Sequence, residues 1–515
     1  MPLKKQPFTI VKDKLVQAVD VDDNRGRAVP ANMNYIEEGY LAKDTGCSLH
    51  GVAETTLAHS LFVYKQKDGT KYIIRAFGTA LQEYDDTAGT WGDITSSPVF
   101  TAGAEFGYIV YENELWLGNA VESLYKWDGT TFTAYATLPK GNIMEIFEDR
   151  LFISGVTAEP LTTYYSNAGV FATFTSTDVL KPLGTDHTTG LVNYFGSLLI
   201  FKEQSIWKLT FIYDQVVSLF IPKLESQNRN YGAISRKSIS WVENDVWFFN
   251  GREVRSIGFK DQQIGVLGVN NSVLSEPIKE TLAYLVSSNY SKVTSFYFNR
   301  RYYLSFPLTG TANNVTFVCH LLHGNNWTKY TDRIKSNANS YIEDDGVIYT
   351  TQSITPFGTL KWSDSLLNDN AVAIPANVTF KAVEDEDFSK FNIYRYLDIL
   401  FKDLKARVVT TIKSDASDLR QTKEKTYIVG QDVEGEENAL GEVPVGDLLI
   451  ADSFGELRAT SPFLKRRISF LSKVQSITIQ LSNNQTDETF TVAQFALTGT
   501  KQPRKQFSTK NIISI

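Results

Sequence analysis

The residues best suited to bind a metal are Cys319, His320 and His323. Thiolate and imidazole groups are ligands that zinc prefers. In a strand, however, residues 320 and 323 point to opposite faces, and the other three histidines stand far away in the sequence. The spacing therefore favours ordinary strand or turn residues, and we expect no metal and no cofactor.

Acidic side chains are abundant, but their spacing does not indicate catalysis. Glu384–Asp387 lacks the glycine and the alternating ligands of a calcium loop, which favours a solvated linker. Asp85–Trp91 lacks the spacing of the repeated aspartate motif of sialidases. No carboxylate pair stands out among 58 acidic residues. The chain also lacks Gly-x-Ser-x-Gly, a phosphate-binding glycine loop and His-Glu-x-x-His, so we predict that it is not an enzyme.

The composition indicates a large β-protein without a membrane anchor. Of the 515 residues, 42% are hydrophobic and 13% aromatic, with 25 Tyr and 32 Phe against 3 Met and 2 Cys. A net charge of −7 argues against a protein that coats nucleic acid. The first residues lack the apolar run of a signal peptide, no apolar stretch is long enough to span a membrane, and the two cysteines are expected to be free thiols. We therefore expect folding in a cytoplasm.

A repeated strand–turn–strand pattern points to the elements that would position any site. Leu124–Trp127 ends at Asp128-Gly129, and Val246–Phe249 ends at Asn250-Gly251. Such turns between alternating runs are strong hairpin signals. About seven such hairpins follow one another at roughly 40–50 residues, a period typical of β-propellers.

The pattern divides the chain into three parts. Residues 1–55 are predicted to be an extended lead-in that closes or braces the propeller, and residues 56–370 carry the repeat. Residues 371–515 contain longer alternating strands, such as 391–401 and 474–481, and are predicted to form an antiparallel β-sandwich-like domain. The predicted fold class is thus all-β: a propeller of about six or seven blades plus a C-terminal β-sandwich-like domain.

Charged segments of the last part are the candidate interface. Two are basic clusters, Lys465–Arg467 near the start of a predicted strand and Lys501–Lys505. The third is a long acidic loop over Gln431–Asp447, interpreted as a mobile hairpin or contact arm. The predicted interface residues are Lys465, Arg466, Arg467, Glu434, Glu436 and Glu437. Their opposite charges suit contacts between subunits.

Several stretches resemble tail and neck propeller proteins of tailed bacteriophages. The most specific is Tyr164–Gly169, followed by Gly190-Leu191 and then by Gly196–Leu209, similar to a "YSN … GL … G-LL-FKE-SIW-L" run in such proteins. Residues 17–46 resemble their opening, and 463–501 resembles their terminal β-domain.

The resemblance implies a virion structural protein: a tail nozzle or hub subunit of short-tailed phages, assembled in the host cytoplasm. Copies would form a ring, expected to be a hexamer, around the DNA exit channel. DNA would pass without specific binding, and neighbouring tail, adaptor or portal proteins, and tail fibres, would be the partners. The alternative is a tail-tip or receptor-binding protein with an exposed aromatic cluster on one propeller face. A glycan-acting enzyme is less favoured, since no carboxylate pair stands out.

Overall fold

The computed structural model describes most of the chain. The described residues are 6–12, 29–36, 39–175, 177–215, 219–261, 266–270, 272–355, 357–380, 383–384, 390–415, 423–429, 442–444, 463–474 and 476–503. Two compact units divide it: residues 47–321 with 330–364, and residues 1–46 with 322–329 and 365–515. No helix in the described part is long and apolar enough to cross a membrane.

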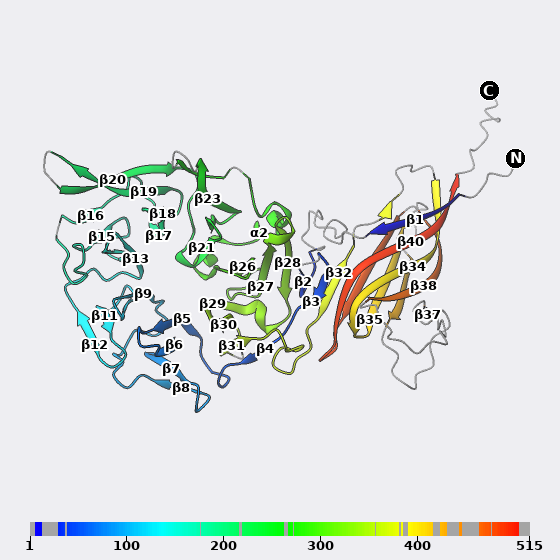
Figure 1. Ribbon diagram of the computed structural model, residues 1–515, viewed down its shortest axis with the longest axis horizontal. Coiled ribbons are helices and arrows are strands. Elements are labelled where there is room, and N and C mark those ends of the chain that lie inside the picture. The colour runs from blue at the N-terminus through cyan, green and yellow to red at the C-terminus, as the bar shows by residue number, and fades with distance from the viewer. Residues whose placement is uncertain are drawn as a thin grey trace, which may run out of the picture. The chain divides into compact units, whose positions relative to one another are not determined.

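The first unit is a seven-bladed β-propeller. Within the described residues, seven four-stranded antiparallel sheets follow one another round a closed circle in Figure 1, and of their strands part of β28 (Asn326–Thr331) lies in the range assigned to the other unit. The strands of blades one to three are β5 (Ala58–Lys65), β6 (Lys71–Phe77), β7 (Ala80–Asp85), β8 (Thr90–Asp93), β9 (Gly107–Tyr111), β10 (Glu114–Gly118), β11 (Leu124–Trp127), β12 (Phe132–Tyr135), β13 (Ile143–Phe147), β14 (Arg150–Ser154), β15 (Thr163–Tyr165) and β16 (Val179–Leu180).

The remaining four blades contain longer strands and the short helices. Their elements are β17 (Thr188–Tyr194), β18 (Ser197–Lys202), β19 (Ile206–Asp214), β20 (Leu219–Asn228), η1 (Arg236–Ser238), β21 (Ile239–Val242), β22 (Asp245–Phe249), β23 (Val254–Asp261), β24 (Val266–Val269), η2 (Glu276–Ile278), α2 (Lys279–Leu282), η3 (Ser287–Lys292), β25 (Thr294–Phe298), β26 (Arg301–Phe306), β27 (Val315–His320), η4 (Leu321–His323), β28 (Asn326–Thr331), η5 (Ile334–Asn337), β29 (Ala338–Asp344), β30 (Val347–Gln352) and β31 (Thr359–Trp362).

Tight turns join the first and second strands of the blades. Glu112 and Asn113 both have positive φ (47° and 69°), and so do Glu148 and Asp149 (46° and 53°). Positive φ at both central residues defines the two-residue turn whose twist matches that of paired strands. These turns explain why the predicted hairpins form where the apolar runs stop.

A strand from the N-terminal side completes the last blade. β4 (Cys47–Leu49) pairs antiparallel with β31, so the fourth strand of blade seven precedes blade one in sequence. Leu61 and Ile73 of blade one pack against Ile342 and Tyr349 of blade seven. The circle is thus closed by backbone pairing and by apolar contact, which protects the sheet edges.

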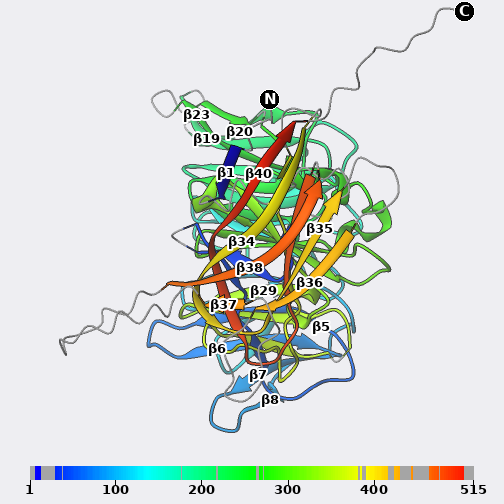
Figure 2. The ribbon, with the colours of Figure 1, turned by 90° about the vertical axis from the view of Figure 1, so that its right-hand side faces the viewer.

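The second unit is a β-sandwich (Figure 2). One sheet runs β2-β3-β40-β34-β38-β37, with β1 also on β40, and the other runs β32-β39-β35-β36, with β33 also on β39. The strands are β1 (Gln6–Lys12), β2 (Met33–Tyr35), β3 (Leu41–Lys43), β32 (Ala376–Thr379), β33 (Val383–Glu384), β34 (Lys390–Lys405), β35 (Val408–Asp415), β36 (Lys423–Val429), β37 (Glu442–Pro444), β38 (Phe463–Val474), β39 (Ser476–Asn483) and β40 (Thr489–Pro503).

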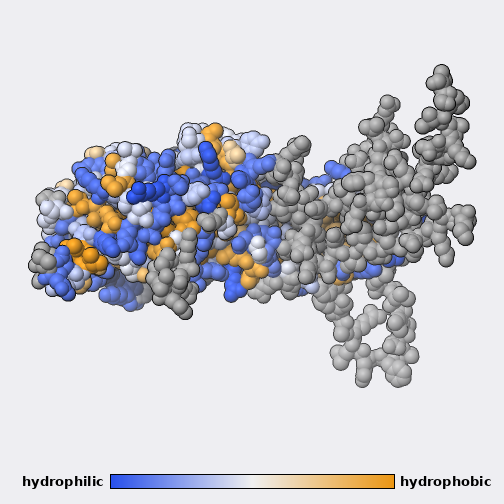
Figure 3. Space-filling view, turned by 90° about the horizontal axis from the view of Figure 1, so that it is seen from above, coloured by the Kyte–Doolittle hydropathy of each residue, from blue (hydrophilic) through white to orange (hydrophobic). Residues whose placement is uncertain are grey.

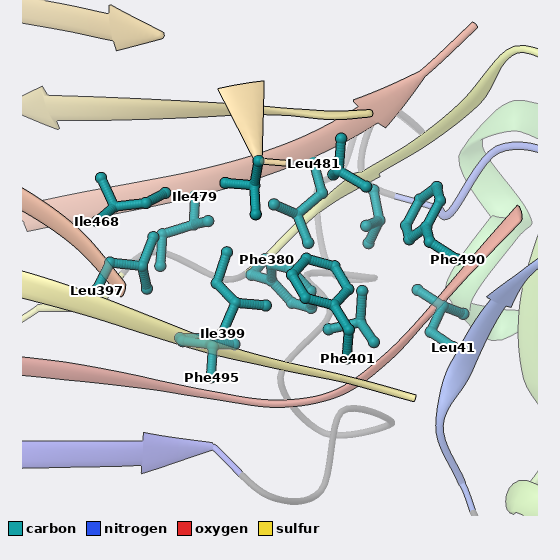
Figure 4. Packing of buried hydrophobic residues seen from close by; sticks show 14 of the residues in the cluster. Leu41, Phe380, Leu397, Ile399, Phe401, Ile468, Ile479, Leu481, Phe490 and Phe495 are labelled. Atoms are coloured by element: carbon teal, nitrogen blue, oxygen red, sulfur yellow. The ribbon is translucent and has the colours of Figure 1, made fainter. Parts of the chain in front are cut away.

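Apolar side chains from both sheets meet in one core (Figure 4). Leu397 and Ile399 of β34 lie with Ile479 and Leu481 of β39, and each is almost fully buried. In β39, buried and partly buried residues alternate along the strand, as expected when one face of a sheet is covered. The all-β class, the propeller and the β-sandwich-like domain are therefore confirmed, with seven blades.

The lead-in is shared between the two units. Of its described strands, β1, β2 and β3 belong to the sandwich sheet that contains β40, whereas β4 and the residues after it belong to the propeller. The division of the chain falls after Asp364, a few residues before the predicted boundary at 370. The assignment of the lead-in strands to the two units depends on pairings between strands hundreds of residues apart, which no local sequence pattern predicts.

Candidate interaction sites

The run that resembles phage proteins folds into blades three and four. Its residues lie in β15, β17, β18 and β19. Lys202, at the end of β18, has a completely buried side chain whose Nζ lies 3.1 Å from Asp186 Oδ1. The other oxygen, Asp186 Oδ2, accepts hydrogen bonds from Ser205 Oγ (3.0 Å) and from the Gln204 amide (3.2 Å). Trp207 Nε1 in turn donates to Ser205 Oγ at 3.2 Å.

This network gives Lys202, Ser205 and Trp207 of that run a structural role. A buried ammonium group needs a counter-charge and hydrogen-bond acceptors. Asp186 supplies the charge, and the carbonyl oxygens of Pro182 and Gly184 accept from Lys202 Nζ at 3.4 and 3.3 Å. Lys202, Ser205 and Trp207 therefore hold the turn between β18 and β19 and the start of the next hairpin.

That next hairpin, β19–β20, extends beyond its blade. β19 pairs with β18 only over Ile206–Leu209, but it pairs with β20 as far as Asp214 and Leu219. Within the described residues, the outer half of the hairpin therefore has no third strand hydrogen-bonded to it, although β24 of the next blade approaches β20. Figure 1 shows β19 and β20 as a long pair of strands.

The outer half of this hairpin exposes apolar side chains on both of its faces. Ile212, Tyr213 and Phe220 are 44%, 53% and 63% exposed. Successive residues of a strand point to opposite faces, so Ile212 and Tyr213 reach solvent on different sides. The Tyr213 and Phe220 rings contact each other, with centroids 5.4 Å apart. We call Ile212, Tyr213 and Phe220 the hairpin tip; exposed apolar residues gathered in this way mark interaction sites.

A second aromatic group lies at the first turns of blades four and five. Phe195 is 56% exposed with a positive φ of 42°, and Trp241 is 39% exposed. Their ring centroids are 5.5 Å apart. Phe195 and Gly196 are the two central residues of the tight turn between β17 and β18, and both have positive φ (42° and 76°), as in other first turns of the propeller. The third strand of a blade runs in the same direction as the first, so this pair and the hairpin tip belong to the same propeller face.

On the side shown in Figure 3, hydrophobic areas are interspersed with hydrophilic side chains. Other exposed apolar side chains of the described part, such as Leu183 and Tyr284, form no ring contact with an exposed aromatic neighbour. The hairpin tip and the Phe195–Trp241 pair, in which exposed rings contact each other, are therefore the candidates for contact with another molecule.

The basic residues predicted as an interface lie on β38. Arg467 Nε and Nη2 donate to the two carboxylate oxygens of Asp398 on β34, at 2.6 and 2.8 Å. Lys465 Nζ lies 3.2 Å from Asp398 Oδ2, and Arg466 stands between them on the strand. Burial raises the pKa of Asp398, but the bonds from Arg467 and Lys465 outweigh it and lower the pKa overall. The two cations thus stabilise the pairing of β34 with β38.

The predicted acidic interface residues Glu434, Glu436 and Glu437 lie outside the described residues, and of that arm the structure describes only β37. That strand pairs antiparallel with β38 within the same chain, with Val443 opposite Arg467 and Pro444 opposite Arg466.

The candidate metal ligands occupy ordinary positions. Cys319 and His320 end the buried strand β27, and both cysteines are free and buried. His323 lies in η4, with its ring 5.8 Å from that of Tyr35. Among the described residues, no group of three or more His, Cys, Asp or Glu side chains is placed to hold a metal ion.

Glu145, on the inner strand β13, carries a testable pH dependence. Burial raises its pKa from 4.5 to about 7, against hydrogen bonds from the Ile146 and Asn193 backbones. Between pH 4.5 and about pH 7, the Glu145 carboxyl group is protonated in the folded chain and ionised in the unfolded chain. The free energy of unfolding therefore falls as pH rises through this range. The loss of unfolding free energy is up to about 3 kcal/mol at 1.36 kcal/mol per pKa unit.

Denaturant unfolding at pH 5 and pH 8 should show this loss in the wild type and not in Glu145→Gln. The exposed Glu148→Gln is the control, and equal pH dependence in all three proteins would contradict the assignment.

The fold and these sites define a seven-bladed β-propeller joined to a β-sandwich. No protein-family model and no curated protein sequence matches the chain. Among solved structures, it is similar to the computationally designed Ika8 protein, with a TM-score of 0.38, 10% identity, and coverage of 62% of this chain and 99% of that one.

Two natural propellers are similar at the same level. For the Pan2 WD40 domain of Neurospora crassa the TM-score is 0.35 at 10% identity, covering 62% of this chain and 97% of that one. For YCF48 bound to D1 peptide the TM-score is 0.39 at 12% identity, covering 66% of this chain and 98% of that one. The propeller assignment rests on the sheet order of this chain, and these likenesses carry no inference about activity or partners.

Proposed function

We propose that this chain is a virion structural protein of a tailed bacteriophage: a tail nozzle or hub subunit that forms an oligomeric ring around the DNA exit channel. The observation that carries the proposal is the hairpin tip. It exposes apolar side chains on both faces, and it continues the run that resembles phage tail propeller proteins. A two-stranded ribbon is marginally stable alone, so a neighbouring subunit that covers it would stabilise both.

The proposal assigns the rest of the chain to scaffolding. The Lys202 network builds the base of the hairpin, and the closed propeller holds that base rigidly. Copies of the chain would be the first partners, with tail, adaptor or portal proteins and tail fibres as further partners. A net charge of −7 suits a channel wall along which DNA passes without specific binding.

The hairpin tip provides the experiment. In a Tyr213→Ser/Phe220→Ser double variant, we expect self-association to weaken at least about tenfold, since buried aromatic anchors dominate interface energies. Light scattering over a concentration series measures this change. Lys223→Gln, an exposed change on the same hairpin, is the control and should associate like the wild type. Association that survives in the double variant would contradict the role of the tip.

The Phe195–Trp241 pair favours a second candidate, a tail-tip or receptor-binding protein. An exposed aromatic platform on a propeller face suits recognition of a cell-surface sugar or protein. Binding of the monomer to host cells, lost in Trp241→Ala but kept in the hairpin double variant, would support this candidate over the first.

A further inference from the structure

The propeller contains a cavity of about 440 Å³ at its axis. The first strands of six blades line it: β5, β9, β17, β21, β25 and β29. First strands of neighbouring blades contact one another, as β21 does β25 and β25 does β29, so they surround the axis. The volume lies in the range of pockets that hold small molecules.

Two adjacent cationic residues of η1 enter this cavity. Arg236 Nη2 donates to the Phe106 carbonyl at 2.8 Å, which uses one of the five donors of its guanidinium group. Within the described residues, Arg236 forms no ion pair with a carboxylate. Burial lowers its pKa, with Glu105 acting against the shift. The guanidinium therefore keeps unused donors in a cavity where its charge is incompletely balanced.

Lys237 adds a second charge beside it. Its side chain is only 10% exposed, and its Nζ lies 2.7 Å from Glu105 Oε1 and 3.3 Å from the Asn339 carbonyl. Burial also lowers the pKa of Lys237, and the charges of Arg236 and Lys292 add to that shift. Burial likewise lowers the pKa of nearby His59, so its imidazole is neutral at pH 7. Two cations of η1 thus face a single carboxylate.

The surrounding wall completes a site for an anion. Arg236 and Lys237 are partly buried and share one carboxylate, so an incoming negative group would add compensating charge. Tyr108, Thr294 and Ser340 also line the cavity, and hydroxyl groups can donate to oxygen atoms of a ligand. We propose that the axial cavity binds a small free oxyanion, a phosphate or a carboxylate, through Arg236 and Lys237.

Calorimetric titration of the whole chain at low salt tests this proposal, with inorganic phosphate and citrate as the probes. We expect saturable binding of at least one probe at one site per chain, accompanied by a rise in melting temperature. Arg236→Gln should weaken binding at least about tenfold, the size of one lost charged hydrogen bond. Glu105→Gln should tighten it, because Lys237 loses its competing partner. The exposed Arg252→Gln is the matched control and should bind like the wild type.

The two probes separate the sources of the anion. Preference for phosphate would indicate a phosphorylated ligand, and preference for citrate a carboxylate. Absence of saturable binding of both to the folded wild type would overturn the proposal, as would binding left unchanged by both Arg236→Gln and Glu105→Gln. If Arg236→Gln does not fold, the Glu105→Gln comparison alone decides. Because no subunit contact enters this experiment, its result is independent of ring formation.

Discussion

Asp186→Asn is expected to destabilise the propeller by about 3–5 kcal/mol, the cost of leaving a buried charge without its partner. The Lys202 side chain is completely buried, and Asp186 is the carboxylate that pairs with it. The amide of Asn keeps the shape of the side chain but removes the negative charge. The melting temperature, or the midpoint of urea unfolding, measures the loss.

Two further variants show whether charge is the cause. Asp186→Asn/Lys202→Met removes both charges and should recover part of the loss, since no buried charge then remains unpaired. Glu203→Gln changes an exposed carboxylate, 3.8 Å from His187, and should have an effect below about 0.5 kcal/mol. An Asp186→Asn protein as stable as the wild type would contradict the assigned role of the network.

Trp127→Ala should be similarly damaging, with an expected loss of about 3–5 kcal/mol. Trp127 is 1% exposed, and its ring lies 5.5, 5.0 and 5.4 Å from the rings of Tyr64, Tyr72 and Phe132. It therefore packs blade two against blade one, and truncation would leave a cavity between them. Denaturant unfolding monitored by circular dichroism measures the change.

Trp241→Ala is the matched control for this prediction. It removes the same side chain from a half-exposed position, and we expect a loss of about 1 kcal/mol or less. If the two variants were equally destabilised, burial between the blades would not be what makes Trp127 important.

The hairpins of the propeller could be predicted because their signals are local. Asp128-Gly129 and Glu112-Asn113 are turn sequences between alternating apolar runs, and a few neighbouring residues are enough to determine each turn. The closing strand β4 is different: the lead-in was expected to close or brace the propeller, but the pairing of Cys47 with Trp362 depends on contacts across the whole repeat.

The candidate sites were less predictable for a related reason. β19 has 9 residues, only one more than the third strand of the next blade, β23, with 8, so the length of the apolar run is a weak signal of an extended hairpin. Arg236 and Lys237 look like ordinary surface cations in the sequence, and only the ring of inner strands encloses them. The charge of the basic residues of β38 suggests an intersubunit contact, whereas Asp398, which pairs with two of them, stands 67–69 positions earlier on another strand.

Electron microscopy of the purified chain, alone and mixed with its candidate tail or portal partner, tests the proposed function most directly. The account predicts closed rings of a fixed number of subunits, formed by the chain itself or on addition of the partner, and disrupted by the Tyr213→Ser/Phe220→Ser change. Particles that remain single copies under both conditions, while the same preparation binds host cells, would contradict it.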